Sequence, residues 1–194
     1  ARTASEIFSV PLDQVTPYMR SKAKTVNFGI IYGISDFGLA RQLGVPRGEA
    51  AQYIDSYFAR YTGVKAYMER EKQKARELGY VETLFGRRRY LPDIKAKNFN
   101  RRSFAERTAI NTPIQGTAAD IIKIAMLKVA ENLREAQVKS RVLLQVHDEL
   151  VLEITEKERE QVARIVKDTM EHAVELAVPL VADVAVGKNW AQAK

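Results

Sequence analysis

The chain has 194 residues, a formal net charge of +7, no cysteine and 46% hydrophobic residues, which is the composition of a globular protein with one or two structural units. The lack of cysteine excludes disulfides and thiolate metal sites, and with His147 and His172 as the only histidines we expect no zinc centre, so a metal would need carboxylate ligands. No apolar run approaches the roughly 20 residues of a membrane span and no signal-peptide pattern begins the chain, so we expect a cytoplasmic protein.

The first strong helical pattern begins at Pro17, after a suitable N-cap at Thr16, and reaches Tyr32. Four side chains recur at every fourth residue and share one face of this helix: Arg20, Lys24, Phe28 and Tyr32. The opposite face is apolar and suits a core: Met19, Ala23, Val26 and Ile30. Two cations followed by two aromatic rings suit a phosphate chain followed by a base, although an ordinary helix with a solvated basic face explains the pattern equally well.

The next elements are two helices and a hairpin. Apolar spacing predicts helices over 47–60 and 64–78, the second ending at Gly79. Residues 80–91 are strand-like around Gly86 and predict a hairpin that carries arginines on one arm.

Positive charge is concentrated between Phe85 and Arg107, where eight cations stand against two carboxylates and aromatic residues are interleaved. From Glu131 onward the balance reverses, with twelve acids and nine bases. A local basic patch of this kind indicates binding of a polyanion such as nucleic acid. A solvated surface loop is the alternative.

The second half of the chain begins with one helical block over about 101–135, with Pro113 inside it. Its apolar stripe from Ile114 through Ala118 to Leu133 predicts a continuous buried face. Helices combined with antiparallel hairpins, without regular βαβ alternation, indicate an α+β fold.

Residues 142–154 alternate like two strands, and a capping box of Thr155 and Glu158 predicts a helix that extends to about Ala177. Residues 181–186 predict a last strand.

The turn between the two strands of 142–154 breaks the usual turn chemistry. Two-residue turns favour Asn-Gly or Asp-Gly, whereas this turn is His147-Asp148 between apolar strands. When a turn lacks the residues that its geometry favours while the flanking strands follow the usual pattern, the exception indicates a functional site. We interpret Asp148 as a Mg²⁺ ligand, with Glu149 close by and His147 as a positioning donor; a polar surface bend is the alternative.

Four segments in chain order resemble motifs of the family A DNA polymerases, the bacterial DNA polymerase I type. They are Arg20-x3-Lys24-x3-Phe28-Gly29-x2-Tyr32-Gly33, GYVETLFGRRRY at 79–90, NTPIQGTAAD at 111–120 and QVHDE at 145–149. The first resembles the fingers motif and the last the second catalytic palm motif, and the resemblance covers Ala1 to Lys194. It implies a helical fingers subdomain with a small β-hairpin over 1–100. Residues 101–194 would be the C-terminal half of an antiparallel-sheet palm packed on long helices.

The resemblance assigns the helix face to the incoming dNTP. Arg20 and Lys24 would contact the triphosphate, and Lys24 would also protonate the departing pyrophosphate. Phe28 would pack on the sugar and base, and phenylalanine at this position implies rejection of dideoxynucleotides. Tyr32 would stack at the templating position and leave it when the helix closes.

The resemblance also implies catalytic and DNA contacts. Asp148 would bind the catalytic Mg²⁺ ions, with Glu149 beside it, and His147 would lie near the primer terminus. Three residues would contact the nascent pair or template through the minor groove: Arg107, Asn111 and Gln115. That groove hardly distinguishes the base pairs, which suits an enzyme that accepts every correct pair.

Two of these assignments have alternatives. Thr112-x-x-Gln115 is also a capping box, which would give Gln115 a structural role. Phosphate contact is expected for at least one of Arg87, Arg88 and Arg89, and simple surface charge for the others.

Two-metal phosphoryl transfer needs at least two anchoring carboxylates, and the family's earlier palm motif, Asp-Tyr-Ser-Gln-Ile-Glu-Leu-Arg, does not occur in this sequence. We therefore expect a C-terminal piece of a larger polymerase, without thumb, exonuclease-like domain or the rest of the palm, that does not catalyse alone. Its partners would be primer-template DNA, a dNTP and the N-terminal part of the polymerase. A catalytically incomplete nucleic-acid-binding module and one half of a split polymerase are the other hypotheses. Glu149 is a poor substitute for the missing ligand, since adjacent residues on a turn seldom hold two metals symmetrically.

Overall fold

The computed structural model describes residues 1–8 and 10–193, which form two compact units. Of these residues, the first unit contains those within 1–82 and 88–113, and the second contains 83–87 and 114–193. Helices predominate and the described strands form two antiparallel pairs, so the α+β fold class is confirmed. The units divide after Pro113, and the fingers and palm assignments of 1–100 and 101–194 stay a prediction. No described helix combines the length and apolarity that crossing a membrane requires.

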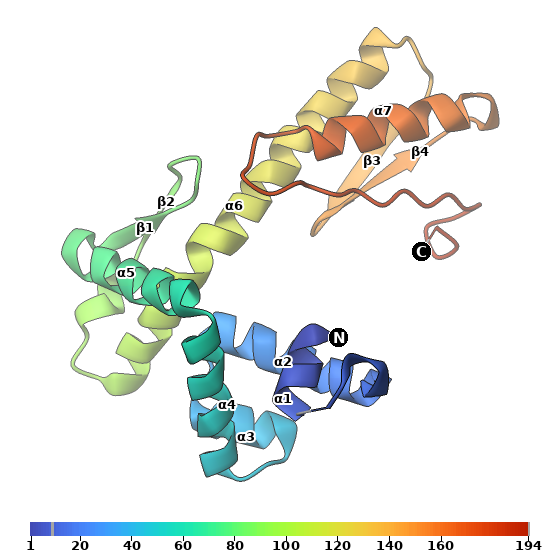
Figure 1. Ribbon diagram of the computed structural model, residues 1–194. Coiled ribbons are helices and arrows are strands. Elements are labelled where there is room, and N and C mark those ends of the chain that lie inside the picture. Colours follow the sequence, from blue (N-terminus) through green and yellow to red (C-terminus); the bar gives the residue numbers. More distant parts are fainter. Residues whose placement is uncertain (9, 194) are drawn as a thin grey trace. The chain divides into compact units, whose positions relative to one another are not determined.

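The elements of the first unit follow one another with short connections (Figure 1). They are α1 (Arg2–Phe8), the 3-10 turn η1 (Leu12–Gln14), α2 (Pro17–Ile31), α3 (Asp36–Leu43), α4 (Arg47–Arg60), α5 (Thr62–Leu78), β1 (Tyr80–Glu82), β2 (Arg88–Tyr90), the 3-10 turn η2 (Pro92–Lys95) and the first part of α6 (Phe99–Glu135). The helices α2, α4 and α5 and the hairpin confirm the predicted elements. The sequence pattern did not predict α1 and α3, which are too short for a helical period to be recognised.

Helix α2 has the capping and the two faces that its sequence predicts. The Thr16 hydroxyl accepts from the Met19 amide at 3.2 Å, and Pro17 is the first helical residue. Gly29 lies inside the helix, whereas Gly33 lies beyond it with φ +76°. The inward face joins α3 and α4 in one core: Val26, Ile30, Leu39, Ala40, Leu43 and Ala50.

A second core in this unit fixes the first part of α6. It gathers buried residues of α5, β1, η2 and α6: Ala75, Val81, Leu91, Ile94, Ala105 and Ala109. The Tyr67 hydroxyl donates to the Ile110 carbonyl at 3.0 Å and joins α5 to α6 directly. Burial raises the pKa of Tyr67 to about 12, so this phenol keeps its donor proton at neutral pH.

Helix α6 confirms the predicted helical block over 101–135 and runs through Pro113 without a break. A proline removes one intrahelical donor and usually bends a helix. The Thr112 hydroxyl donates to the Thr108 carbonyl at 2.7 Å inside the helix. Thr112 therefore begins no helix, and the capping box of Thr112 and Gln115 is wrong.

The second unit combines the later part of α6 with β3 (Arg141–Val146), β4 (Glu149–Glu153), the 3-10 turn η3 (Glu156–Glu158) and α7 (Arg159–Glu171). Figure 1 shows α7 alongside the end of α6 and the hairpin. Its core contains Val129, Leu133, Val162 and Val166, with Val142, Leu150 and Leu152 packed against them.

Several predictions for this unit are wrong. Helix α7 ends at Glu171, not near Ala177, and residues 181–186 form no strand among the described residues. A strand needs a neighbour that accepts its backbone hydrogen bonds, and within residues 1–8 and 10–193 the strands β3 and β4 pair only with each other. The apolar stripe is also not continuously buried, because Ile114 is 44% exposed and Ala118 is exposed.

The predicted capping box of Thr155 and Glu158 does not form before α7, and other hydrogen bonds stabilise this segment. The Thr155 side chain caps no helix. The Glu158 carboxylate instead accepts from the Lys139 amide at 2.9 Å, and from the amide and hydroxyl of Ser140 at 3.0 and 2.6 Å. These hydrogen bonds stabilise the charged form and lower the pKa of Glu158 to about 2.

The substitution Glu158→Gln is expected to flatten the acid dependence of stability. Because the folded pKa lies below the ordinary value of 4.5, the unfolded chain binds more protons between pH 4.5 and about 2. The contribution of this carboxylate is complete above pH 4.5 and disappears as the pH falls through about 2. Urea unfolding at a series of pH values gives the free energy of unfolding as a function of pH. Between pH 4.5 and about 2, this free energy should fall less steeply with decreasing pH for Glu158→Gln than for the parent. The exposed neighbour Glu156→Gln should behave as the parent, and equal slopes for all three proteins would contradict the assignment.

Candidate functional site

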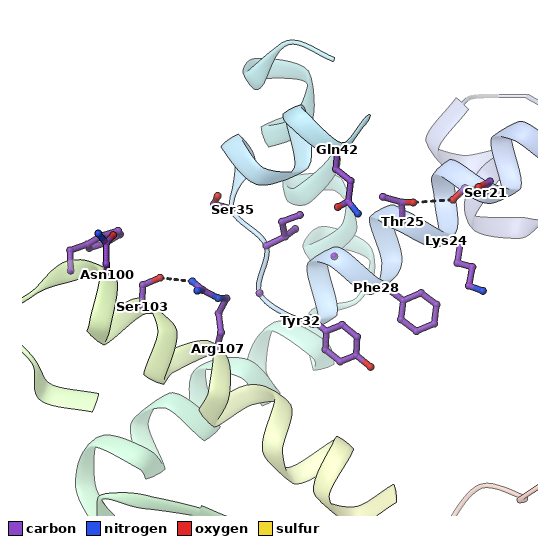
Figure 2. Close-up of a pocket in the computed structure, with 14 residues that line it drawn as sticks. Ser21, Lys24, Thr25, Phe28, Tyr32, Ser35, Gln42, Asn100, Ser103 and Arg107 are labelled. Carbon is purple, nitrogen blue, oxygen red and sulfur yellow. Dashed lines mark hydrogen bonds between the residues drawn. The ribbon is translucent and has the colours of Figure 1, made fainter. Parts of the chain in front are cut away.

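The outward face of α2 forms a continuous row of side chains. Arg20, Lys24 and Phe28 are exposed, with Phe28 at 48%, and Tyr32 ends the helix half-buried. The rings of Phe28 and Tyr32 stack at 6.1 Å with an interplanar angle of 24°. The Lys24 ammonium lies 5.7 Å from the centre of the Phe28 ring. Figure 2 shows Lys24, Phe28 and Tyr32 projecting from the same side of the helix.

This row lies beside a cleft of about 950 Å³ within the first unit. The walls come from α2, from the segment that leads into α3, and from the start of α6 (Figure 2). Among the residues singled out from the sequence, the cleft brings together Lys24, Phe28, Tyr32 and Arg107. Arg20 lies on the same face of α2, one turn before Lys24.

Sequence reasoning missed the wall that α6 contributes through Phe99, Asn100 and Ser103. A signal was present, since Phe99, Ser103, Arg107 and Asn111 recur at every fourth residue, the same spacing as the row on α2.

Arg107 is held in place by its own helix and by the turn after α2. It donates to the Ser103 hydroxyl at 2.8 Å, and its guanidinium carbon lies 6.0 Å from the centre of the Phe104 ring. A Cβ on Gly33 would come within 3.2 Å of the Arg107 Cγ. Glycine at this position therefore meets two requirements, the positive φ and the close approach of Arg107.

Asn111 and Gln115 differ in their surroundings. The Asn111 Oδ1 is buried and has no hydrogen-bond partner in residues 1–8 and 10–193. Buried acceptors are normally satisfied, by protein groups or by ordered water. Gln115 belongs to the second unit and is exposed.

Each of the three hairpin arginines has an intramolecular partner. Arg88 pairs with Glu82 at 2.9 Å and lies 4.6 Å from the centre of the Tyr80 ring. Arg89 makes a long contact of 3.5 Å to the Thr112 hydroxyl, and Arg87 pairs with an aspartate of α6.

The turn at His147-Asp148 has an unusual backbone conformation for its residue types. Val146 pairs with Glu149, which leaves a two-residue turn, and His147 adopts φ +52°. Glycine normally provides a positive φ at the first position of such a turn. The Gln145 side-chain amide donates to the His147 carbonyl at 2.6 Å and holds the bend.

The strands that lead to this turn are less buried than their apolar sequence suggests. Leu143 is 52% and Leu144 is 42% exposed, and His147, Asp148 and Glu149 are all exposed at the tip. The carboxylates are therefore accessible to a ligand from solvent.

Asp148 fits a Mg²⁺ site only in part. A carboxylate oxygen is the ligand type that Mg²⁺ prefers, and proteins often bind this ion through one or two carboxylates together with substrate phosphates. No group of three or more His, Cys, Asp or Glu side chains suited to a metal occurs in the part of the chain that the structure describes. Asp148 is thus suited to act as one ligand, with others from elsewhere.

Comparison with known proteins gives consistent matches along the whole chain. The family model described as DNA polymerase family A matches residues 1–192. The chain is 56% identical over 193 residues to DNA polymerase I of Bacillus caldotenax and 58% identical over 191 residues to DNA polymerase I of Pseudomonas aeruginosa. These alignments cover 100% and 98% of the chain but only 22% and 21% of the relatives. The chain therefore spans about one-fifth of the length of these relatives.

A solved structure is similar in fold as well. The POL domain of Pol1 from M. smegmatis, in complex with DNA primer-template and dNTP, matches with a TM-score of 0.94 and 45% sequence identity. The match covers 98% of this chain and 34% of that one.

Proposed function

Because the chain belongs to DNA polymerase family A, we propose that it forms the nucleotide-binding and second metal-binding segments of a template-directed DNA polymerase. The complete enzyme would add a dNTP to the 3′-end of a primer. The observation that carries the proposal is the row of Lys24, Phe28 and Tyr32 beside the cleft, with Arg107 on the opposite wall. Relatives named DNA polymerase I and a neighbour described with primer-template DNA and dNTP support it. The relatives named above are bacterial and bacterial DNA lies in the cytoplasm, so we propose that the enzyme acts there.

The α2 row would bind the incoming nucleotide in the order of its chemical parts. Arg20 and Lys24 form no ion pair with described residues, so both are available for phosphate oxygens. Phe28 offers an exposed ring to the sugar and base, and Tyr32 a stacking surface for the templating base. Lys24 would also give a proton to the pyrophosphate as it leaves.

The hairpin tip would hold Mg²⁺ through Asp148, with Glu149 beside it and His147 near the primer terminus. When bound, the Mg²⁺ ions would neutralise the negative charge that develops on the phosphates during transfer. A two-metal mechanism needs a further carboxylate, which we propose comes from the N-terminal part of a longer polymerase. By itself the chain would be inactive.

Template and primer would be bound by α6 and by the basic hairpin. Asn111, Arg107 and Gln115 would contact the nascent pair or template through the minor groove. Arg88 and Arg89 are candidates for phosphate contacts, because the exposed Arg88 can exchange its ion pair with Glu82 for phosphate at little cost and Arg89 makes only a long contact to Thr112.

The proposal predicts a specific defect for Arg20→Ala in the intact polymerase. Loss of one charge-assisted phosphate contact should raise the KM for dNTP about 10- to 100-fold. Steady-state extension of a primed template measures the change. Arg41→Ala, which removes an exposed arginine from α3, is the matched control and should leave the KM within twofold. An unchanged KM in Arg20→Ala would refute the nucleotide assignment of this face.

A catalytically incomplete nucleic-acid-binding module, or one half of a split polymerase, is the second candidate. It is favoured by the absence of a complete metal site from the described residues. The mass of the native protein distinguishes these cases. A native chain of the present length would favour the module, and co-purification with a partner that supplies a catalytic aspartate would favour the split enzyme.

A further inference from the structure

The loop between β1 and β2 is a closed structure that attaches to α6. The Thr83 amide donates to the Arg87 carbonyl at 3.0 Å, and the Arg87 amide donates to the Thr83 hydroxyl at 3.1 Å. The Leu84 amide then donates to the Thr117 hydroxyl of α6 at 2.8 Å. These residues belong to the second unit, so the loop and this part of α6 form one body.

The Arg87 side chain spans one turn of α6. Its Nε donates to Asp120 Oδ1 at 2.7 Å and its Nη2 donates to the Gly116 carbonyl at 3.0 Å. The two acceptors are four residues apart on the helix. Arg87 reaches both because its guanidinium has several donors in a fixed fork, which no other side chain has. Arg88 differs, because its partner Glu82 lies on the same hairpin.

Asp120 depends on this contact. Its side chain is 13% exposed, and its Oδ2 is buried without a hydrogen-bond partner among the residues that the structure describes. Removal of Arg87 would leave a largely buried carboxylate without its cation, which is more costly than loss of an exposed ion pair.

The position of the clamped turn explains why it needs support. Pro113 withholds one backbone donor from α6, and Gly116 has low helix propensity. The turn that contains Gln115 lies between these two weak points. A side chain that binds the Gly116 carbonyl and Asp120 from outside stabilises the adjoining turn 116–120, which begins directly after Gln115.

We propose that Arg87 is a positioning residue that clamps the 116–120 turn of α6 and thereby orients Gln115, and that it does not itself bind DNA phosphate. The role of Gln115 in this inference rests on the proposed function. The clamp itself is a property of the fold.

The first test compares Arg87→Lys and Arg87→Gln in the intact polymerase. Lysine keeps the charge but lacks the fork. Both variants should lower kcat about tenfold, as expected for a displaced contact, and both should keep the parent's dependence of DNA affinity on salt. A phosphate contact would give the opposite result, with the salt slope reduced by about one in Arg87→Gln and restored in Arg87→Lys. That result would overturn the inference.

The second test is a double-mutant cycle on melting temperature, which needs no polymerase activity. Arg87→Gln should lower the Tm, and adding Asp120→Asn should lower it no further, because the stranded charge is then removed. Arg141→Gln, which breaks the exposed pair with Glu153 in the same unit, is the control and should change the Tm little. Additive losses in the double mutant would overturn the clamp. A parent protein that extends no primer but shows the coupling would instead contradict the proposed function.

Discussion

Asp148→Ala is expected to lower template-dependent primer extension by the intact polymerase about 1000-fold. This corresponds to a loss of about 4 kcal/mol of transition-state stabilisation, the scale of removing one anchor of a catalytic metal. Asp148 is exposed at a hairpin tip, so its replacement leaves no cavity and should not impair folding. Single-turnover extension in Mg²⁺ measures the effect.

The control for this substitution is Asp168→Ala, which removes an exposed carboxylate from α7 in the same unit. It should extend primers as the parent does. Primer-template affinity should be nearly unchanged in Asp148→Ala, since a carboxylate does not attract the DNA backbone. Full activity in Asp148→Ala would refute the metal assignment.

Lys24→Ala is expected to lower the rate of the chemical step about 100-fold, the lower part of the range for a lost general acid. It should also raise the Kd for dNTP, because one phosphate contact is lost. Lys24→Arg keeps the positive charge and should restore nucleotide binding while leaving the chemical step slow. Rapid-quench kinetics at several dNTP concentrations separates the two quantities.

A lysine on the same helix provides the control for Lys24. The Lys22 ammonium donates to the Leu43 carbonyl at 2.8 Å, so Lys22 joins α2 to the end of α3. Lys22→Ala should lower stability but leave the chemical step unchanged. A defect of equal size in both variants would indicate that Lys24 acts only through the stability of α2.

The parts of the fold that the sequence predicts correctly are those decided by local chemistry. Thr16 and Pro17 define the start of α2, and the apolar face that includes Val26 and Ile30 meets the core as its spacing requires. Gly79 and Gly86 both adopt the positive φ that their places at the end of α5 and in the hairpin demand.

The predictions that failed depended on partners distant in the chain. Residues 181–186 have strand-forming side chains, but no described strand pairs with them. Thr155 and Glu158 have the spacing of a capping box, yet the Glu158 carboxylate is bound by Lys139 and Ser140. A sequence pattern does not show with which of several possible partners a polar side chain forms its hydrogen bonds.

Some residues of the candidate site could likewise be predicted from the sequence, and others could not. The α2 row and the His147-Asp148 turn could be recognised because each is continuous in sequence. The opposite wall of the cleft, with Phe99 and Ser103, depends on how α6 packs in the first unit. The partner of Arg87 likewise required the structure, since Asp120 lies 33 residues away.

The most direct test of the central claim is a crystal structure of the intact polymerase with primer-template DNA and a non-hydrolysable dNTP. We predict that the triphosphate oxygens lie within hydrogen-bond distance of the side chains of Arg20 and Lys24, and that the ring of Phe28 contacts the sugar or base. A triphosphate bound elsewhere, with the α2 row still exposed to solvent, would contradict the claim.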